Sequence, residues 1–425
     1  MIRTYDKASE LLSFRQEILN RNKFNLTPVT FESQSDWTLT DGAVSHKSGG
    51  FFHIVGIQNE LTKETKTILY QPQSAVTGLL INIHHNKIWI CLQARAEPGN
   101  TGIVQFGPSI QSTAANYMKL HGGKDTDFLP YFLNFKSDSR LLNFTMQTDL
   151  GELYYQKSKT HNYVEVYNKL ESTQNTCWVE LNSLFTLLQQ DYFINTDLRS
   201  LLAMYDWDHF LSKELLETPI NEELLTYFFR QKATYKNKHK IIPLDKLLKW
   251  QINGANLIDL STQRVAASLF RVKAATREIS NWTQPLLTIQ GKGLCLLYRR
   301  CINGQVEFLI SVIEESGIDN GVILSPSVML YPGENTDGVT KLGEVYRTFE
   351  HSEEGGRFLH YESIFEVRNV EPDMPHDEHQ FWVSALELKN LFKHSNMVCI
   401  QLRVITSSIL DDLNPITLNK ASSNR

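Results

Sequence analysis

Three features that would assign this chain to a specialised class of protein are scarce or missing. The 425 residues include only five cysteines, an odd number without a Cys-x-x-Cys pair, so reduced thiols are expected rather than a disulfide framework. Basic residues number 42 against 47 acidic residues, for a formal net charge of −5. This balance argues against a nucleic-acid binding protein, because a phosphate backbone is bound by a basic face.

Long apolar segments are also missing. No run approaches the roughly 18 apolar residues of a membrane-spanning helix, and residues 1–14 carry acidic side chains where a signal peptide has its apolar segment. We therefore expect a cytoplasmic protein with no membrane partner. No Gly-x-Gly-x-x-Gly follows a predicted strand, so no redox cofactor is expected. The remaining composition is ordinary, 41% hydrophobic and 21% charged, over a length that suits two or three domains.

The most informative stretch runs from Cys91 to Gly123. It begins like a buried strand, breaks at Glu97-Pro98-Gly99-Asn100 and resumes as an extended run over residues 103–106. Proline fixes φ and glycine permits positive φ, which explains the break but not the polar track that follows. This track suits a polar, phosphorylated, hydroxyl-rich ligand better than an apolar core, and with its flanking arginine and histidine it comprises Arg95, Ser109, Gln111, Ser112, Thr113, Asn116, Tyr117 and His121.

Periodicity predicts a strand-rich protein with some helices. Apolar residues recur at helical spacing over residues 5–21, and residues 76–94 predict a β-hairpin that turns at His85-Asn86-Lys87. The region 197–248 is predicted to be a helical connection, with the basic segment 230–240 as a solvated helix end.

Comparison of the chain with itself indicates an internal duplication. Trp37 corresponds to Trp250, and Gln71-Pro72 to Gln284-Pro285, at an offset of 213 residues. Further correspondences, at offsets of 218 and then 204 residues, are Glu97-x-Gly99 with Glu315-x-Gly317, Pro108-Ser109 with Pro326-Ser327, Thr148-Asp149-x-Gly151 with Ser352-Glu353-x-Gly355, and Trp178-Val179 with Trp382-Val383. Because the landmarks keep one order, we predict two copies of one unit, residues 1–196 and residues 197–425, the second beginning with the helical connection.

Several of these segments together resemble the NDP-hexose 2,3-dehydratases of deoxysugar biosynthesis. They are QARAEPGN (93–100), VQFGPSIQST with AANY (104–117), NWTQPLL (281–287) and SEEGGRF (352–358), and WTLTDGAVSHKSGGFF (37–52) fits the same family. The resemblance covers nearly the whole chain, from about Trp37 to Trp382, and the Glu-Pro-Gly-Asn motif with its Gln-Ser-Thr continuation is fairly specific.

The chain also departs from the family pattern. The family's Ser-Glu-Gln-Gly and Arg-Asn-Arg-Asn stretches are replaced by Thr148-Asp149-Leu150-Gly151 and Lys159-Thr160-His161-Asn162. The family's Pro-Thr-Val-Gln is Pro108-Ser109-Ile110-Gln111 in the first copy and Pro326-Ser327-Val328-Met329 in the second. These differences leave open which of the two expected pockets is competent and which sugar is preferred.

The resemblance implies an α+β fold of two tandem Nudix-like α/β/α sandwich domains, and a homodimer. The implied substrate is a dTDP-4-keto-6-deoxyhexose. A base removes the C3 proton beside the C4 ketone, the enolate expels the C2 hydroxyl as water, and a 3,4-diketo-2,6-dideoxyhexose results. A separate NAD(P)H-dependent 3-ketoreductase would act on this product, so no cofactor and no metal are expected in this chain.

The implied roles fall on residues that match the family motifs. His121 is a candidate base or acid, Tyr117 a donor to the C4 oxygen, and Glu97 an alternative base. Arg95 and Arg357 are expected to bind the diphosphate, because the guanidinium fork matches phosphate. The residues expected to line the nucleotide or sugar, or to act in the second pocket, are Gln105, Ser109, Gln111, Thr113, Asn116, Trp282, Glu353 and Glu354.

Other interpretations stay open at this point. Each candidate also has an ordinary structural role, as a turn residue, a core aromatic or a solvated charge. A metal-dependent nucleotide-sugar pyrophosphohydrolase would need glutamates that hold Mg²⁺, but Glu353-Glu354-x-Gly356 lacks the rest of the Nudix motif. The segment His376-Asp377-Glu378-His379 offers no third metal ligand that can be named. A catalytically silent nucleotide-sugar binding protein is the third alternative.

Overall fold

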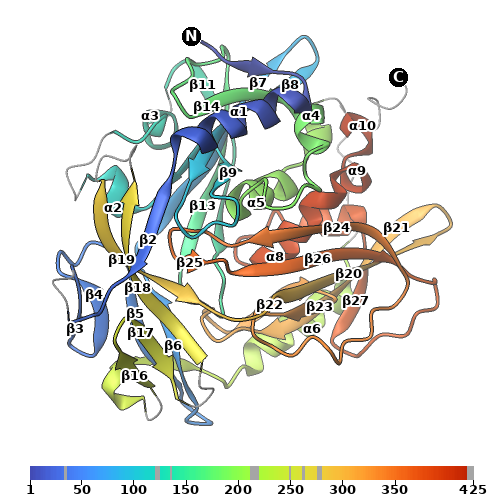
Figure 1. Cartoon of the computed structure of the whole chain (residues 1–425). Helices are drawn as coiled ribbons and strands as arrows, with labels where there is room; N and C mark the ends of the chain where they lie inside the picture. Colours follow the sequence, from blue (N-terminus) through green and yellow to red (C-terminus); the bar gives the residue numbers. More distant parts are fainter. Residues whose placement is uncertain are drawn as a thin grey trace.

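The fold was obtained as a computed structural model, which describes residues 1–32, 36–119, 125–134, 136–210, 220–247, 250–260, 264–274 and 280–418. The strands of these residues form four sheets, two large and two small (Figure 1). Each half of the chain contributes one large sheet with helices against it and most of one small sheet. The architecture is therefore α+β, as expected. None of the described helices is long and apolar enough to span a membrane.

The large sheet of the first half has the strand order β1-β14-β8-β7-β13-β11, with β9 on β8 and β10 on β7. Its strands alternate apolar side chains between two buried faces. Leu79 of β7 faces helices α1, α4 and α5, whereas Leu80 packs with Tyr131 of α3 on the opposite face. The elements are β1 (Thr4–Tyr5), α1 (Ala8–Arg21), β7 (Ala75–His84), β8 (Lys87–Ala96), β9 (Val104–Gly107), β10 (Ile110–Ser112), α2 (Ala114–Tyr117), α3 (Leu129–Leu133), β11 (Ser139–Thr148), β13 (Ser158–Val166), β14 (Thr176–Glu180), α4 (Leu181–Phe185) and α5 (Thr196–Met204).

The large sheet of the second half has the order β22-β21-β20-β26-β24, with β23 on β20 and β27 on β21. Cys295 and Leu297 of β20 pack into the main core with α6 and α8, and Leu294 and Leu296 lie on the other face. The elements are α6 (Glu222–Thr234), β20 (Gly293–Ile302), β21 (Gln305–Glu314), β22 (Val322–Pro326), β23 (Val328–Leu330), β24 (Glu344–Ser352), β26 (Glu362–Asn369), β27 (Gln380–Ser384), α7 (Ala385–Leu391), α8 (Ile400–Thr406), α9 (Leu410–Leu413) and α10 (Pro415–Leu418).

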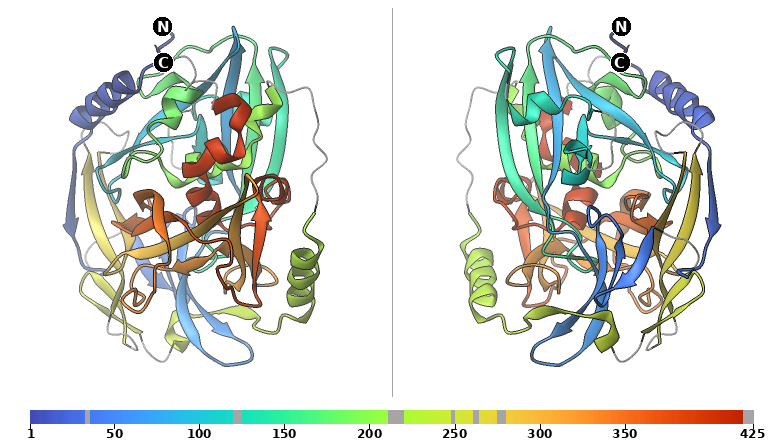
Figure 2. Two further views of the ribbon diagram at one scale, coloured as in Figure 1. Left: turned by 90° about the vertical axis from the view of Figure 1, so that its right-hand side faces the viewer. Right: turned by 90° about the vertical axis from the view of Figure 1, so that its left-hand side faces the viewer.

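The two small sheets exchange one strand between the halves. Strand β2, near the start of the first half, pairs with β18 of the second half, and β15, near the start of the second half, pairs with β5 of the first. Figure 2 shows β2 running along the yellow strands on the side of the molecule opposite α6. The elements are β2 (Phe24–Pro28), β3 (Trp37–Thr40), β4 (Ala43–His46), β5 (His53–Asn59), β6 (Thr65–Tyr70), β12 (Tyr154–Tyr155), β15 (His239–Ile242), β16 (Trp250–Asn253), β17 (Asn256–Asp259), β18 (Arg264–Ala274), β19 (Asn281–Thr288) and β25 (Phe358–Leu359).

The strand registers repeat between the halves at the offsets found in the sequence. Trp37 pairs with His46 as Trp250 pairs with Asp259, which agrees with the offset of 213 residues. The correspondence of Gln71-Pro72 with Gln284-Pro285 is wrong. Leu69 pairs with Tyr154 as Leu287 pairs with Phe358, so the offset is already 218 at β6. The five additional residues lie in the hairpin of β18 and β19, before this point in the chain, and its strands are longer than β5 and β6.

The local predictions are partly confirmed. The hairpin of β7 and β8 turns at His85 and Asn86, which both have positive φ. The connection between the halves is less helical than expected. Helix α6 ends at Thr234, and the basic segment runs into strand β15, whose partner β5 lies in the other half. No local pattern in residues 230–240 could indicate that partner.

Candidate active site

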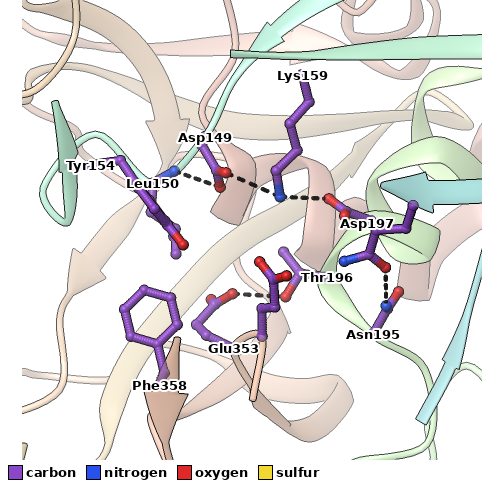
Figure 3. Close-up of a pocket in the computed structure, with 11 residues that line it drawn as sticks. Asp149, Leu150, Tyr154, Lys159, Asn195, Thr196, Asp197, Glu353 and Phe358 are labelled. Carbon is purple, nitrogen blue, oxygen red and sulfur yellow. Dashed lines mark hydrogen bonds and ion pairs between the residues drawn. The ribbon is translucent and has the colours of Figure 1, made fainter. Parts of the chain in front are cut away.

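A small cavity lies between the two halves (Figure 3). Its walls come from β10, the segment from β11 to β13, the N-terminus of α5, and the segment from β24 to β25. The lining residues are Gln111, Asp149, Leu150, Tyr154, Lys159, Asn195, Thr196, Asp197, Glu353, Glu354 and Phe358. Five of these carry carboxylate or ammonium groups, which is unusual for a buried surface and typical of a site that binds or transforms a polar ligand.

The lining combines residues that correspond to one another in the two halves. Three pairs separated by 204 residues line it together, namely Asp149 with Glu353, Leu150 with Glu354, and Tyr154 with Phe358. The other lining residues, all polar, lie on β10, on β13 and at the start of α5, and their counterparts 218 or 204 residues later are mostly less polar. They are Gln111, Lys159, Asn195, Thr196 and Asp197, against Met329, Ser363, Cys399, Ile400 and Gln401. The polar chemistry is therefore concentrated on the side of the first half.

The loops that carry these residues are held in place by tight turns of the opposite half. Gly99 donates its backbone N–H to the carbonyl of Gly355 at 2.9 Å, and Gly317 donates to the carbonyl of Gly151 at 2.7 Å. The Asn100 side chain also accepts from the Gly355 N–H at 2.7 Å. A Cβ at Gly99 or at Gly317 would overlap the backbone of the facing loop. The Glu-x-Gly motifs found in the sequence are thus the points where each half holds the other's cavity loop.

Lys159 is the central cation of the cavity. Its Nζ lies 3.1 Å from Asp149 and 2.9 Å from Asp197, and all three side chains are at least 93% buried. Burial lowers the pKa of Lys159, but the two aspartates outweigh it and hold the pKa well above its usual value. Burial would raise the pKa of Asp149, and Lys159 with Lys157 instead brings it below the usual range. Lys159 and Asp149 are therefore a charged pair at neutral pH.

Glu353 has a different environment. Its Oε2 accepts a hydrogen bond from the Thr196 hydroxyl at 2.7 Å, and Thr196 in turn lies 2.8 Å from Nε2 of His351. Burial raises the pKa of Glu353 to about 7, and the hydrogen bond from Thr196 opposes this shift. Burial and the charge of Arg199 hold the pKa of His351 well below its usual value, so the imidazole is neutral. Glu353 is a carboxyl that can gain or lose a proton near neutral pH.

Tyr154 brings a hydroxyl donor to the same space. Its ring is buried, and its hydroxyl has no hydrogen-bond partner among the described residues. Figure 3 shows the ring reaching into the space above Phe358. The Nζ of Lys157 lies 4.0 Å from the ring centroid. Burial keeps the pKa of Tyr154 well above its usual value, so the hydroxyl stays protonated.

The residues predicted in the Glu-Pro-Gly-Asn region lie beside the cavity. Arg95 forms an ion pair with Glu97 at 3.0 Å and donates to the backbone carbonyl of Gln111. Gln111 lines the cavity and accepts from the Asn195 side chain at 2.8 Å. Gln105 donates across the halves to Ser352 at 2.7 Å, one residue before Glu353. Arg95, Glu97 and Gln105 thus support the walls without lining the cavity.

Ser109 has the same backbone contacts as its counterpart in the second half. Its hydroxyl accepts from the Leu80 N–H at 2.8 Å and donates to the Cys91 carbonyl at 2.5 Å. Ser327, 218 residues later, accepts at 2.9 Å and donates at 2.5 Å in the equivalent positions. The repetition points to a structural role in joining neighbouring strands.

The other predicted residues lie away from the lining. Thr113 precedes α2, Asn116 is exposed, and Tyr117 packs against the apolar cluster on the face of the first sheet opposite α5. Trp282 donates to the Gln284 side chain at 2.6 Å. His121 lies outside the described residues. The proposed roles of these residues stay predictions.

Arg357 lies next to the cavity, two residues beyond Gly355. Its guanidinium stacks over Phe52 at 4.5 Å and donates to the Gly356 carbonyl at 2.8 Å. Its Nε is buried and has no partner among the described residues. An unpaired N–H donor on a half-buried guanidinium leaves capacity to bind an anionic group.

Comparison with known proteins identifies the family. The family model described as NDP-hexose 2,3-dehydratase matches residues 8–205 and 221–409. The chain belongs to the NDP-hexose 2,3-dehydratase family. A relative from Streptomyces violaceoruber, named dTDP-4-dehydro-6-deoxy-alpha-D-glucopyranose 2,3-dehydratase, is 26% identical over 91% of this chain and 94% of its own. A relative of the same name from Amycolatopsis orientalis is 25% identical over 95% of this chain and 90% of its own.

Sequence reasoning alone missed much of the cavity in this dehydratase-family chain. In the sequence, Asp149 stands out as a repeat landmark and as a departure from the family pattern, Lys159 only as a departure, and no motif marks Tyr154, Thr196 or Asp197 as a site residue. One signal was available, because the offset of 204 residues aligns Asp149 with Glu353. The bridging of Lys159 to Asp197 depends on the approach of β13 to α5, which no spacing in the sequence indicates.

Proposed function

We propose that this protein is a hydro-lyase that removes the C2 hydroxyl of a dTDP-4-keto-6-deoxyhexose as water. The observation that carries the proposal is the match to the dehydratase family in both halves of the chain, with relatives named as 2,3-dehydratases along more than nine-tenths of the chain. The cavity between the halves supports it, because its charged groups suit proton abstraction beside a ketone.

Glu353 is proposed as the base. Its Oε2 is occupied by Thr196, and its Oε1 has no hydrogen-bond partner among the described residues. A base works best when its pKa lies near the working pH, and burial brings that of Glu353 to about 7. The C3–H bond breaks, a new O–H bond forms on Oε1, and the electron pair moves onto the C4 oxygen as an enolate.

Lys159 and Tyr154 are proposed to stabilise that enolate. Both are protonated at neutral pH and both line the cavity. Lys159 directs two of its three N–H bonds to Asp149 and Asp197, which leaves one for an oxygen of the substrate. Donors that are fixed before the reaction stabilise a developing oxyanion without a reorganisation cost.

The enolate then expels the C2 hydroxyl. As the enolate carbonyl reforms, the C2–O bond breaks, and the leaving hydroxyl takes up the proton held by Glu353 and departs as water. The remaining enol tautomerises to the 3,4-diketo-2,6-dideoxy sugar. One carboxyl that titrates near neutral pH can serve both proton transfers.

The rest of the substrate is proposed to extend out of the cavity. Arg357 is proposed as a diphosphate ligand because of its unpaired Nε. Arg95 could take that role only by leaving its ion pair with Glu97.

The wider expectations are part of the same proposal. They are a cytoplasmic homodimer, a separate NAD(P)H-dependent 3-ketoreductase that consumes the product, and descent of the halves from one duplicated Nudix-like unit. The repeated strand registers and the exchanged strands β2 and β15 support the duplication. The boundary between residues 196 and 197 stays a prediction, and the family match leaves residues 206–220 between its two parts.

A single assay tests this function. The protein is mixed with dTDP-4-keto-6-deoxyglucose, with a 3-ketoreductase and NADPH as trap, and products are followed by mass with and without EDTA. Loss of one water, insensitive to EDTA, is expected. Release of a nucleoside monophosphate that EDTA stops would instead identify a pyrophosphohydrolase. Binding without turnover would identify a silent binding protein, and either outcome would overturn the proposal.

A further inference from the structure

Three buried side chains form a continuous hydrogen-bonded chain behind the cavity. His351 lies at the end of β24, Thr196 is the first residue of α5, and Glu353 follows β24. Nε2 of His351 is 2.8 Å from Oγ1 of Thr196, which is 2.7 Å from Oε2 of Glu353. Their exposed fractions are 1%, 5% and 6%. Water therefore has little access to replace these contacts, and a lost one leaves a buried group unpaired.

The donor and acceptor of each hydrogen bond in this series follow from the number of available protons. An ionised Glu353 can only accept, so Thr196 must spend its single hydroxyl proton on Oε2. Thr196 must then accept from His351, which requires the proton on Nε2. His351 is neutral and has one ring proton, so its Nδ1 is bare. In agreement, Nδ1 has no donor among the described residues.

We propose that His351 and Thr196 are positioning residues for Glu353. They occupy Oε2 through the directed chain from Nε2–H of His351 to the Thr196 hydroxyl to Glu353, and they leave Oε1 as the oxygen that takes the C3 proton. This inference rests on the proposed dehydratase function. It goes beyond it by assigning separate tasks to the two carboxylate oxygens and by naming the residues that separate them.

The counterparts in the other half support the assignment. The residues 204 positions away from His351, Glu353 and Thr196 are Gln147, Asp149 and Ile400. Isoleucine has no hydroxyl, so this chain of hydrogen bonds has no counterpart behind Asp149. Asp149 instead faces Lys159 and Lys157. The two corresponding carboxylates therefore differ in chemistry because of the residue at the start of the neighbouring helix.

The charged groups around these three side chains determine how the protonation of Glu353 depends on pH. Besides burial and the hydrogen bond from Thr196, three charged groups act on Glu353. Asp149, which follows β11, and Asp197 of α5 raise its pKa, and Lys159 of β13 lowers it. Arg199 acts on His351. Cys295 and Tyr361 also face Glu353, and both stay protonated because burial raises their pKa well above the usual values.

The test compares Thr196→Val with Thr196→Ser and with the wild type. Valine keeps the shape but removes the hydroxyl, so Oε2 loses its donor and kcat is expected to fall about 10- to 100-fold, as for a hydrogen bond to a charged group. The acid limb of the kcat profile is expected to move to higher pH, because the hydrogen bond lowers the pKa of Glu353. KM should change little. Thr196→Ser should restore both kcat and the profile.

Substitutions at His351 provide a second measurement if Thr196→Val does not fold. His351→Gln can still donate to Thr196 and matches Gln147 of the other half, so it should retain most of the turnover. His351→Leu cannot donate and should behave like Thr196→Val. The matched control is Thr406→Val, because the Thr406 hydroxyl is buried without a partner among the described residues. Its kcat profile should equal that of the wild type.

The outcomes separate this inference from the proposed function. If folded Thr196→Val or His351→Leu keeps the wild-type acid limb and kcat while Glu353→Gln is inactive, Glu353 is the base but the positioning role is wrong. A lower kcat with an unchanged acid limb also contradicts the inference, since it indicates packing alone. If Glu353→Gln turns over like the wild type, the assignment of the base itself fails.

Discussion

Gly317 of the second half lies directly against the loop of the first half that carries Asp149 and Tyr154. Its N–H donates to the Gly151 carbonyl at 2.7 Å, and its own carbonyl accepts from the Gln156 N–H at 2.6 Å. Gly99 makes the equivalent contacts with Gly355 and His360. Each half therefore shapes the cavity loop of the other, and a competent cavity needs both.

The first prediction concerns Gly317→Ala. The added Cβ would overlap the Tyr154 carbonyl oxygen, so the loop must move and displace Tyr154 and Lys159 from the cavity. Overpacking of this kind typically costs about 1–3 kcal/mol, and we expect a lower melting temperature together with a loss of turnover. Gly338→Ala is the control, because a Cβ there meets nothing within 4 Å. Full activity in folded Gly317→Ala would show that the contact is not needed.

Lys159→Met should damage both stability and turnover. It removes the shared partner of Asp149 and Asp197, so Asp197 loses its ion pair and Asp149 keeps only Lys157, at a cost of about 3–5 kcal/mol. Urea unfolding at pH 7 measures the loss. The matched control is Lys47→Met, which removes the exposed ion pair with Asp36 and should change stability by at most about 1 kcal/mol. Equal effects of the two substitutions would contradict a central role for Lys159.

Glu353→Gln should separate chemistry from binding. Removing a general base typically lowers kcat by about 10²- to 10⁴-fold, while dTDP should still bind, which calorimetry can measure. In the wild type, kcat should rise as pH increases through about 7, because the base must be ionised and burial raises its pKa to about 7. Glu344→Gln, an exposed residue of the same segment of chain, should keep the wild-type profile.

The burial of Glu315 predicts that the stability of the fold depends on pH. It is buried, accepts from the Tyr331 hydroxyl at 2.6 Å, and burial raises its pKa to about 7. An unfolded glutamate titrates near about 4.3, so between these values the folded state binds more protons and stability falls as pH rises. Glu315→Gln removes this contribution and should flatten the fall in melting temperature between pH 5 and pH 8. Glu371→Gln, an exposed control, should follow the wild type, and a Glu315→Gln curve parallel to both would refute the assignment.

Much of the fold could be predicted because it depends on local patterns. The turn at His85 and Asn86 follows from their position between two apolar strands, and the correspondence of Trp37 with Trp250 follows from a repeated order of landmarks. The correspondence of Gln71 with Gln284 is wrong because matching dipeptides contain no information about the longer hairpin of β18 and β19. Strand β15 was missed because its partner lies in the other half.

The site was predicted less well than the fold, and for a physical reason. Glu353, Glu354 and Gln111 were identified from motifs, and they line the cavity. Tyr154 and Lys159 lie on a segment whose sequence departs from the family pattern, and only the folded chain brings them to Glu353.

The amino-acid sequence by itself determined the family, the repeated order of landmarks and the types of titratable residues present, because motifs and their order survive in the linear chain. Only the tertiary structure decided which carboxyl is buried beside a neutral histidine and which is paired with a lysine. That difference depends on the approach of α5 to the ends of β13 and β24, and burial beside particular neighbours, rather than residue type, sets the pKa of each group.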